Sequence, residues 1–184
     1  MRIERYLLCL LVALLGGGCE ESLRGKGTIF LWNGGEEPIE LRVEGPSPVS
    51  VSLAKEQGRL LTESVAGTYQ ITALKAGKLQ GTTALELERD KLTIFNMDGL
   101  GCFGRADVSG MYTRGKQPVR LLQRYQDETV ITIADDVGAL PGEPLPTKRP
   151  KSDYGFQRVA VVPCDLIQTL GSDFPIEEYI RKLR

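Results

Sequence analysis

The chain has 184 residues, of which 23 are Lys or Arg and 24 are Asp or Glu, and its formal net charge is −1. This balance excludes the class of nucleic-acid-binding proteins, because those proteins need concentrated positive charge to displace counterions from phosphates. The sequence also has no histidine, the side chain that serves most often as a general base and as a metal ligand, so we expect neither an enzyme nor a bound metal or cofactor.

The first residues contain the three parts of a secretory signal peptide. Arg2 and Arg5 give a positive start, residues 6–15 form an apolar run, and residues 16–18 are three glycines. The run is shorter than the about 20 apolar residues that a membrane-spanning helix needs. We therefore expect residues 1–18 to be removed as a signal peptide.

The stretch that ends at Cys19 resembles the lipobox of bacterial lipoproteins. The positions that carry the resemblance are Leu15, Gly17, Gly18 and Cys19. In that family the cysteine is diacylated and becomes the mature N-terminus, which implies a lipid anchor at Cys19 and a tether in residues 19–27. The resemblance also implies the bacterial cell envelope, with Glu20 favouring the outer membrane and its periplasmic side. Ordinary cleavage, which would leave Cys19 unmodified, is the alternative.

The remaining cysteines predict a disulfide. Cys9 leaves with the signal peptide and Cys19 is the lipid site, so Cys102 and Cys164 remain together in an oxidising compartment. A bond between them would close a loop of some 60 residues and add about 4 kcal/mol to stability. Two separate buried thiols are the alternative.

Residues 28–98 have the pattern of short strands joined by turns. IELRVE at 39–44 and VSVSLA at 49–54 alternate apolar and polar residues, so each has one buried face. Runs of strand-forming residues continue at 28–33, 59–65, 67–74, 82–88 and 91–97. Because each strand hides one face and must turn back to be covered, this spacing predicts an all-β fold, an antiparallel β-sandwich.

The stretch AGTYQITALKAG, residues 66–77, resembles the Gly-Thr-Tyr hairpin of small immunoglobulin-like or transthyretin-like sandwiches on bacterial surfaces. The resemblance implies an immunoglobulin-like β-sandwich over residues 28–100, and it implies no particular function because such sandwiches serve many. We expect residues 101–184 to add strands, a Pro-rich loop and a short helix, all packed on the sandwich.

Residues 99–104, GLGCFG, have the spacing of a dinucleotide-binding motif. That motif requires a helix to begin at the glycines, whereas Val108, Gly110 and Thr113 disfavour one. A glycine-rich turn that carries Cys102 is the better interpretation. Further strands are expected at 106–112, 118–125, 129–134 and 158–164.

Residues 135–156 contain four prolines and no apolar period, which predicts a long exposed loop. Asp135 and Asp136 favour a solvated turn there over a calcium site, because the 12-residue ligand pattern is absent. Loops on a rigid scaffold carry most binding contacts. The candidate interaction residues in this loop are Lys148, Arg149, Lys151, Tyr154 and Phe156.

The end of the sequence, DFPIEEYIRKLR at 173–184, predicts a short C-terminal helix. Acidic residues stand near its start and basic residues near its end, as the helix dipole favours. Its apolar stripe consists of Ile176, Tyr179, Ile180 and Leu183. We expect this helix to pack on its own sheet rather than on a partner.

Two further patterns have ordinary structural explanations. Ser52 and Lys55 have the spacing of a Ser-Lys dyad, but on a strand their side chains would point to opposite faces. Phe30 and Trp32 would share a strand face, either as an exposed stacking platform or, as we expect, as part of the core.

These observations predict a non-catalytic envelope lipoprotein that is anchored in the membrane by its lipid. It would act as a binding or assembly component of a membrane-associated complex, with a protein partner in the envelope. A carboxylate-dependent hydrolase of envelope polymers is the alternative, and it would require two carboxylates about 5 to 10 Å apart in a cleft.

Overall fold

The computed structural model describes residues 25–112, 119–133, 137–139 and 156–168, together with residues 141, 143 and 145–148. Several predicted features lie outside this part of the chain. They are the signal peptide, the lipid site Cys19, the aspartates at 135 and 136, and the C-terminal helix of residues 173–184.

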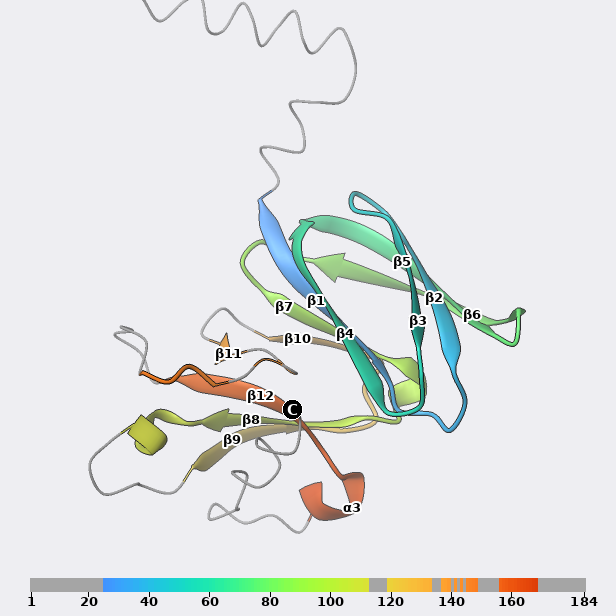
Figure 1. Ribbon diagram of the computed structural model, residues 1–184. Coiled ribbons are helices and arrows are strands. Elements are labelled where there is room, and N and C mark those ends of the chain that lie inside the picture. The colour runs from blue at the N-terminus through green and yellow to red at the C-terminus, as the bar shows by residue number, and fades with distance from the viewer. Residues whose placement is uncertain are drawn as a thin grey trace, which may run out of the picture.

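The described residues form three four-stranded sheets (Figure 1). The central sheet has the order β10-β7-β1-β4, with β1 (Lys26–Asn33), β4 (Gln57–Val65), β7 (Leu92–Asn96) and β10 (Val130–Ile133). The first outer sheet has the order β3-β2-β5-β6, with β2 (Ile39–Glu44), β3 (Val49–Leu53), β5 (Gly67–Lys75) and β6 (Lys78–Leu87). The second outer sheet has the order β11-β12-β8-β9, with β8 (Cys102–Asp107), β9 (Arg120–Tyr125), β11 (Val137–Ala139) and β12 (Gln157–Val162).

Helical structure in this part of the chain is limited to three short elements. They are η1 (Met97–Gly99), η2 (Ser109–Tyr112) and α3 (Cys164–Ile167). Most strand pairs are antiparallel, and the parallel pairs among the described strands are β1 with β7 and β11 with β12. The prediction of an all-β, antiparallel sandwich is therefore confirmed. None of the described helices has the length and apolar character needed to cross a membrane.

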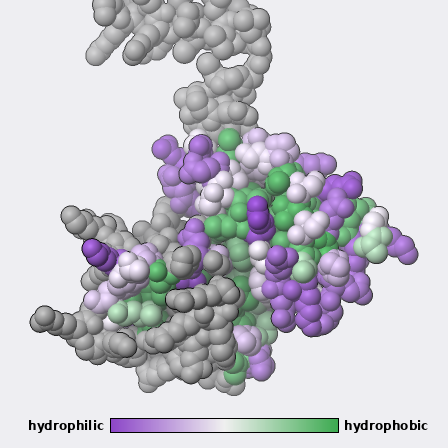
Figure 2. All heavy atoms as spheres, in the orientation of Figure 1, coloured by the Kyte–Doolittle hydropathy of each residue, from purple (hydrophilic) through white to green (hydrophobic). Residues whose placement is uncertain are grey.

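The first outer sheet covers one face of the central sheet, and it does so with alternating side chains. In β2, Ile39, Leu41 and Val43 are buried, whereas Arg42 and Glu44 face solvent. The buried residues pack against the central sheet in one cluster. In Figure 2, hydrophilic residues are prominent on the side of the molecule that holds β2, β3 and β6.

The two middle strands of the central sheet, β1 and β7, are buried on both faces, which explains why their sequences are mostly apolar. In β1, Ile29 and Leu31 face the first outer sheet, whereas Phe30 and Trp32 face the second. The neighbouring strand β7 is likewise buried at each of its positions. Figure 1 shows β1, β4 and β7 between the two outer groups of strands. The core position expected for Phe30 and Trp32 is confirmed.

The second outer sheet begins earlier in the sequence than predicted. We expected a turn through Cys102 and a strand at 106–112, but β8 spans Cys102–Asp107 and a 3-10 turn follows it. Phe103 on one face of β8 packs against the central sheet, while Ala106 on the other face belongs to a separate cluster. The glycines hid this strand, because Gly104 interrupts the apolar alternation without interrupting the pairing with β9 and β12.

The Pro-rich segment is not simply an exposed loop, which corrects our expectation. Its residues 137–139 form β11, which pairs in parallel with β12. Leu145 packs on the outer face of the second outer sheet, and the Tyr112 hydroxyl donates a hydrogen bond to the Pro146 carbonyl at 2.9 Å. The segment therefore covers part of a sheet face that would otherwise be bare.

Candidate functional site

A groove of about 450 Å³ lies where the ends of the central and second outer sheets meet. Its lining includes Trp32, Gly34 and Glu56, which lie at or next to the ends of β1 and β4, and residues 161–164 at the end of β12. Residues 100–102 also line it. Its lining side chains are mostly apolar, which is typical of small binding sites in proteins.

Trp32, the only tryptophan of the sequence, is the aromatic residue among those that line the groove. Its ring stacks on Phe30 at a centroid distance of 6.3 Å and meets the edge of Phe103 at 6.4 Å. The residue is 7% exposed, and its buried indole Nε1 has no hydrogen-bond partner. A buried N–H without a partner costs free energy relative to a hydrogen-bonded one.

The backbone at Gly101 passes directly against this indole. A Cβ at position 101 would lie 2.5 Å from Trp32 Cδ1 and 2.7 Å from Asn96 Oδ1, closer than real Cβ contacts come. A Cβ at Gly34 would lie 3.0 Å from the Gly101 nitrogen. Only glycines allow these two turns to approach each other and form the floor of the groove.

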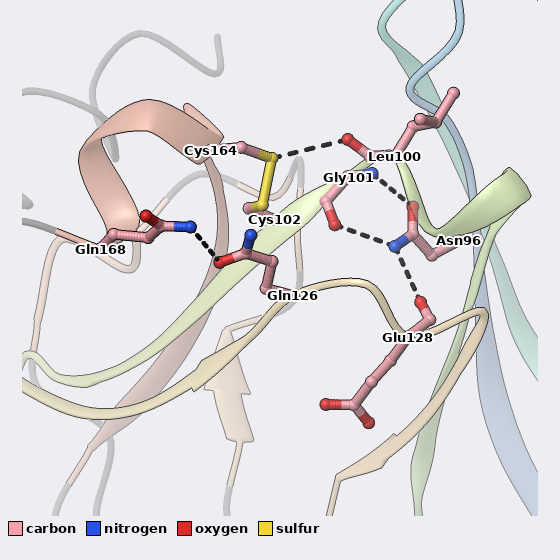
Figure 3. Close-up of a disulfide and its surroundings, with 8 residues drawn as sticks. All are labelled: Asn96, Leu100, Gly101, Cys102, Gln126, Glu128, Cys164 and Gln168. Atoms are coloured by element: carbon pink, nitrogen blue, oxygen red, sulfur yellow. Dashed lines mark hydrogen bonds between the residues drawn. A yellow bond between two sulfur atoms is a disulfide. The ribbon is translucent and has the colours of Figure 1, made fainter.

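The side chain of Asn96 holds this turn in place (Figure 3). Its Nδ2 donates hydrogen bonds to the carbonyl oxygens of Gly101 at 2.9 Å and Glu128 at 2.8 Å, and its Oδ1 accepts one from the Gly101 N–H at 2.7 Å. Asn96 is completely buried. Because every bond of this amide is made to backbone, the turn position is fixed independently of surface side chains.

The disulfide predicted between Cys102 and Cys164 is present beside the groove (Figure 3). It joins β8 to the start of α3 across a sequence separation of 62 residues, with a Cα–Cα distance of 5.2 Å. The Cys164 sulfur lies 3.5 Å from the Leu100 carbonyl oxygen. On the other side of the disulfide, Gln168 Nε2 donates to Gln126 Oε1 at 3.4 Å.

Two exposed side chains, one apolar and one charged, line the groove. Leu100 is 53% exposed, although it is a large apolar residue. Glu56 is exposed and is the only charged side chain that lines the groove. The described lining therefore offers an apolar contact surface and one negative charge, without a nucleophile paired to a base.

The predicted loop residues do not come together as a site in the described chain. Lys148 is exposed, but Phe156 is 2% exposed and packs edge-on against Tyr112 at 5.6 Å. Phe156 is thus a core residue, because its ring fills the space between β12 and the η2 turn. The other three candidates, Arg149, Lys151 and Tyr154, lie outside the described residues.

The possible Ser-Lys pair is resolved as two separate surface residues. Ser52 is exposed on β3, while Lys55 forms an ion pair with Glu36. The hydrogen bond that the Lys55 ammonium donates to the Glu36 carboxylate raises the pKa of Lys55, which keeps its ammonium charged. Among the described residues, no group of three His, Cys, Asp or Glu side chains is arranged to hold a metal ion.

Arg158 is the one charged residue among the buried side chains of the described chain. It is 1% exposed in β12, and its Nε and Nη1 have no hydrogen-bond partner. Burial lowers the pKa of its guanidinium, and the charge of Glu143 partly counters this effect. Arg158 is not among the residues that line the groove.

Sequence reasoning missed the groove because its parts are far apart in the chain. The signal that could have found it is the set of glycines next to Trp32 and Cys102, since paired glycine turns often mark close backbone approach. The chain matches no protein-family model, no curated protein and no solved structure.

Proposed function

We propose that the chain is an exported bacterial envelope lipoprotein, anchored through Cys19, that acts without catalysis as a binding or assembly component of a membrane-associated complex. The observation that carries this proposal is the disulfide between Cys102 and Cys164. Disulfides persist in oxidising compartments outside the cytosol, which is where a leader like residues 1–18 would send the chain.

The groove supports the binding role. It presents the exposed Leu100 beside the largely buried ring of Trp32. An apolar side chain of a partner protein has the chemistry to pack on such a surface. The alternative, a two-carboxylate hydrolase, gains no support from the groove, because Glu56 is the only carboxylate among its lining residues.

The anchor is tested by expressing the full chain in a bacterial host and measuring the mass of its mature N-terminus. We expect an acylated cysteine at position 19 and a protein that sediments with membranes. Cys19→Ala should abolish both acylation and sedimentation, whereas the matched variant Cys9→Ala, inside the leader, should change neither. An unmodified Cys19 on the mature chain would contradict the proposal.

The binding role is tested on the same membranes after solubilisation in mild detergent. On a native gel we expect the protein to migrate with a larger complex, and Leu100→Asp should release it as the free protein. Leu79→Asp is the matched control, because Leu79 is 64% exposed and lies on β6 away from the groove. Migration as the free protein before any substitution, or equal behaviour of both variants, would argue against the groove as the contact surface.

A further inference from the structure

The strand β6 forms one edge of the first outer sheet. Within the described chain it pairs with β5 alone, so one side of its backbone carries no neighbouring strand. Thr82, Ala84 and Glu86 are exposed along it. Figure 1 shows the turn between β5 and β6 projecting at the right of the molecule. An edge of this kind presents a row of backbone N–H and C=O groups with which another strand can pair.

The other sheet edges of the described chain have features that hinder pairing with another strand, namely short length, charge or a bulge. β10 and β11 have four and three residues. β4 carries the exposed Arg59 and Glu63, and β9 carries the exposed Arg120 and Arg124 together with a bulge. β3 has five residues and lies beside β4. By contrast, residues 81–85 of β6 contain no charge, no proline and no bulge.

Contacts between β5 and β6 side chains indicate which backbone groups of β6 point outward. The hydroxyls of Thr72 and Thr82 lie 3.2 Å apart, and the Thr68 hydroxyl donates a hydrogen bond to Glu86 at 2.7 Å. In an antiparallel ladder, side chains come closest at the pairs that exchange no backbone hydrogen bonds. The N–H and C=O groups of Thr82 and Glu86, and of Ala84 between them, therefore point away from β5.

Counting from the hairpin turn gives the same result. Lys75 and Lys78 close a two-residue turn whose central residues both have positive φ, which is the type I′ form with a hydrogen-bonded closing pair. Bonded and non-bonded pairs then alternate along the ladder. With Gln80 as the extra residue of the bulge, Thr82 falls in a non-bonded pair with β5.

We propose that β6 pairs antiparallel with β6 of a second copy of this chain, about a two-fold axis at Ala84. In this register Ala84 faces Ala84 of the second copy, and Thr82 faces Glu86 on each side of the axis. All of these residues present their backbone groups outward, so the two strands exchange about six backbone hydrogen bonds. The first outer sheets of the two copies become one continuous sheet, joined by the same strand from each copy.

A second copy fits this edge because residues 81–87 are complementary to themselves in that register. Ala84 is small and uncharged, so the two strands can meet at the axis without crowding. Thr82 places a hydroxyl opposite the carboxylate of Glu86, the same two groups that Thr68 and Glu86 bring together within the sheet. No like charges face each other across the paired residues, which would destabilise the pair.

The pairing is tested by cross-linking the full chain in mild detergent with a short bifunctional maleimide. Ala84→Cys should give a covalent dimer on a denaturing gel, because hydrogen-bonded residues of an antiparallel pair have Cα atoms about 5.5 Å apart. Gln80→Cys is the register control, since its two thiols would lie about eight residues, or about 27 Å, apart along the paired strands. Ser52→Cys, exposed on β3 at the opposite edge of the sheet, controls for random collisions.

Each outcome of the cross-linking bears on the proposal. A dimer from Ala84→Cys, with none from Gln80→Cys, Ser52→Cys or the unsubstituted chain, supports the pairing and its register. Equal yields from the three variants, or no dimer from Ala84→Cys, would overturn it. A conjugate whose mass differs from two chains would identify a strand of another protein as the occupant and reject the second copy.

Sedimentation velocity provides a second measurement without a cross-link. The unsubstituted chain should sediment as a dimer, whereas Ala84→Lys should sediment as a monomer, because two lysines would face each other at the axis. Ser52→Lys should remain a dimer. Unchanged Trp32 fluorescence in both variants reports an intact fold. A monomeric unsubstituted chain, or dimers in both variants, would reject the pairing.

This edge is separate from the groove and from the lipid site. No residue of β6 is among those that line the groove, and Leu79, the control position of the groove test, precedes the bulge and the paired residues 81–87. Leu100→Asp should therefore leave the cross-link through Ala84→Cys in place. Failure of the pairing and failure of the proposed function are thus seen in different variants.

Discussion

The buried polar side chains near the groove differ in whether their hydrogen bonds are satisfied. Asn96 satisfies its amide entirely with backbone groups of two different loops, and Asn33 does the same with the carbonyls of Glu37 and Ala54 at 2.9 Å each. Trp32 and Arg158 instead keep nitrogens without partners. The amides fix the turns, whereas the unpaired nitrogens mark places where the packing is good but the polar chemistry is incomplete.

The stability cost of tighter packing can be measured at Gly101. Gly101→Ala should lower the free energy of unfolding by about 1–3 kcal/mol, because the new Cβ overpacks the indole of Trp32 and the amide of Asn96. Urea unfolding followed by Trp32 fluorescence gives the value.

The matched control is Gly81→Ala in β6, where a Cβ would meet nothing within 4 Å. It should change the free energy of unfolding by no more than about 0.5 kcal/mol. Equal effects of the two alanines would mean that the floor of the groove is not closely packed.

At the scale of elements, sequence patterning predicted best where one face of a strand meets solvent. β2 and β3 were found at the expected residues because their alternation is regular. The strand β8 was misplaced because its glycines resemble a turn, and only its pairing with β9 and β12 makes it a strand. Pairing partners so far apart in sequence leave no local signal, which is why tertiary context overrides propensity here.

The Pro-rich segment illustrates the same limit. Its prolines and glycines predicted a segment with little regular structure. Composition alone, however, does not indicate whether such a segment faces solvent or covers a sheet. Two of its apolar residues, Leu145 and Phe156, pack in the cluster on the outer face of the second outer sheet. Of the candidate site, the sequence identified the disulfide pair; the groove depends on contacts between distant turns.

At the scale of the whole molecule, the disulfide ties the last described helix to the strand that begins the second outer sheet. Replacing both cysteines, Cys102→Ala with Cys164→Ala, should lower the free energy of unfolding by about 4 kcal/mol, because a long loop in the unfolded chain is no longer closed. The measurement is the urea midpoint under non-reducing conditions.

Reduction of the unsubstituted chain provides the control. Dithiothreitol should move its urea midpoint to that of the double variant, and it should leave the double variant unchanged. If the oxidised chain and the double variant unfolded at the same urea concentration, the bond would make no contribution to stability.

The three-layer arrangement also determines at which stage of synthesis the chain can complete its folding. Thr28 pairs with Leu92 in parallel, so the opening strand waits for a neighbour that is synthesised much later. After that pairing, the outer face of β1 with Phe30 and Trp32 is still exposed until Phe103 and Val159 of the second outer sheet pack on it. A chain that is synthesised from its N-terminus therefore exposes these aromatic side chains to solvent until the later strands are made. Folds that depend on such distant strand pairs form slowly and are prone to aggregate. The central sheet is therefore the part of the molecule that is most exposed to aggregation until the last strands of the second outer sheet have formed.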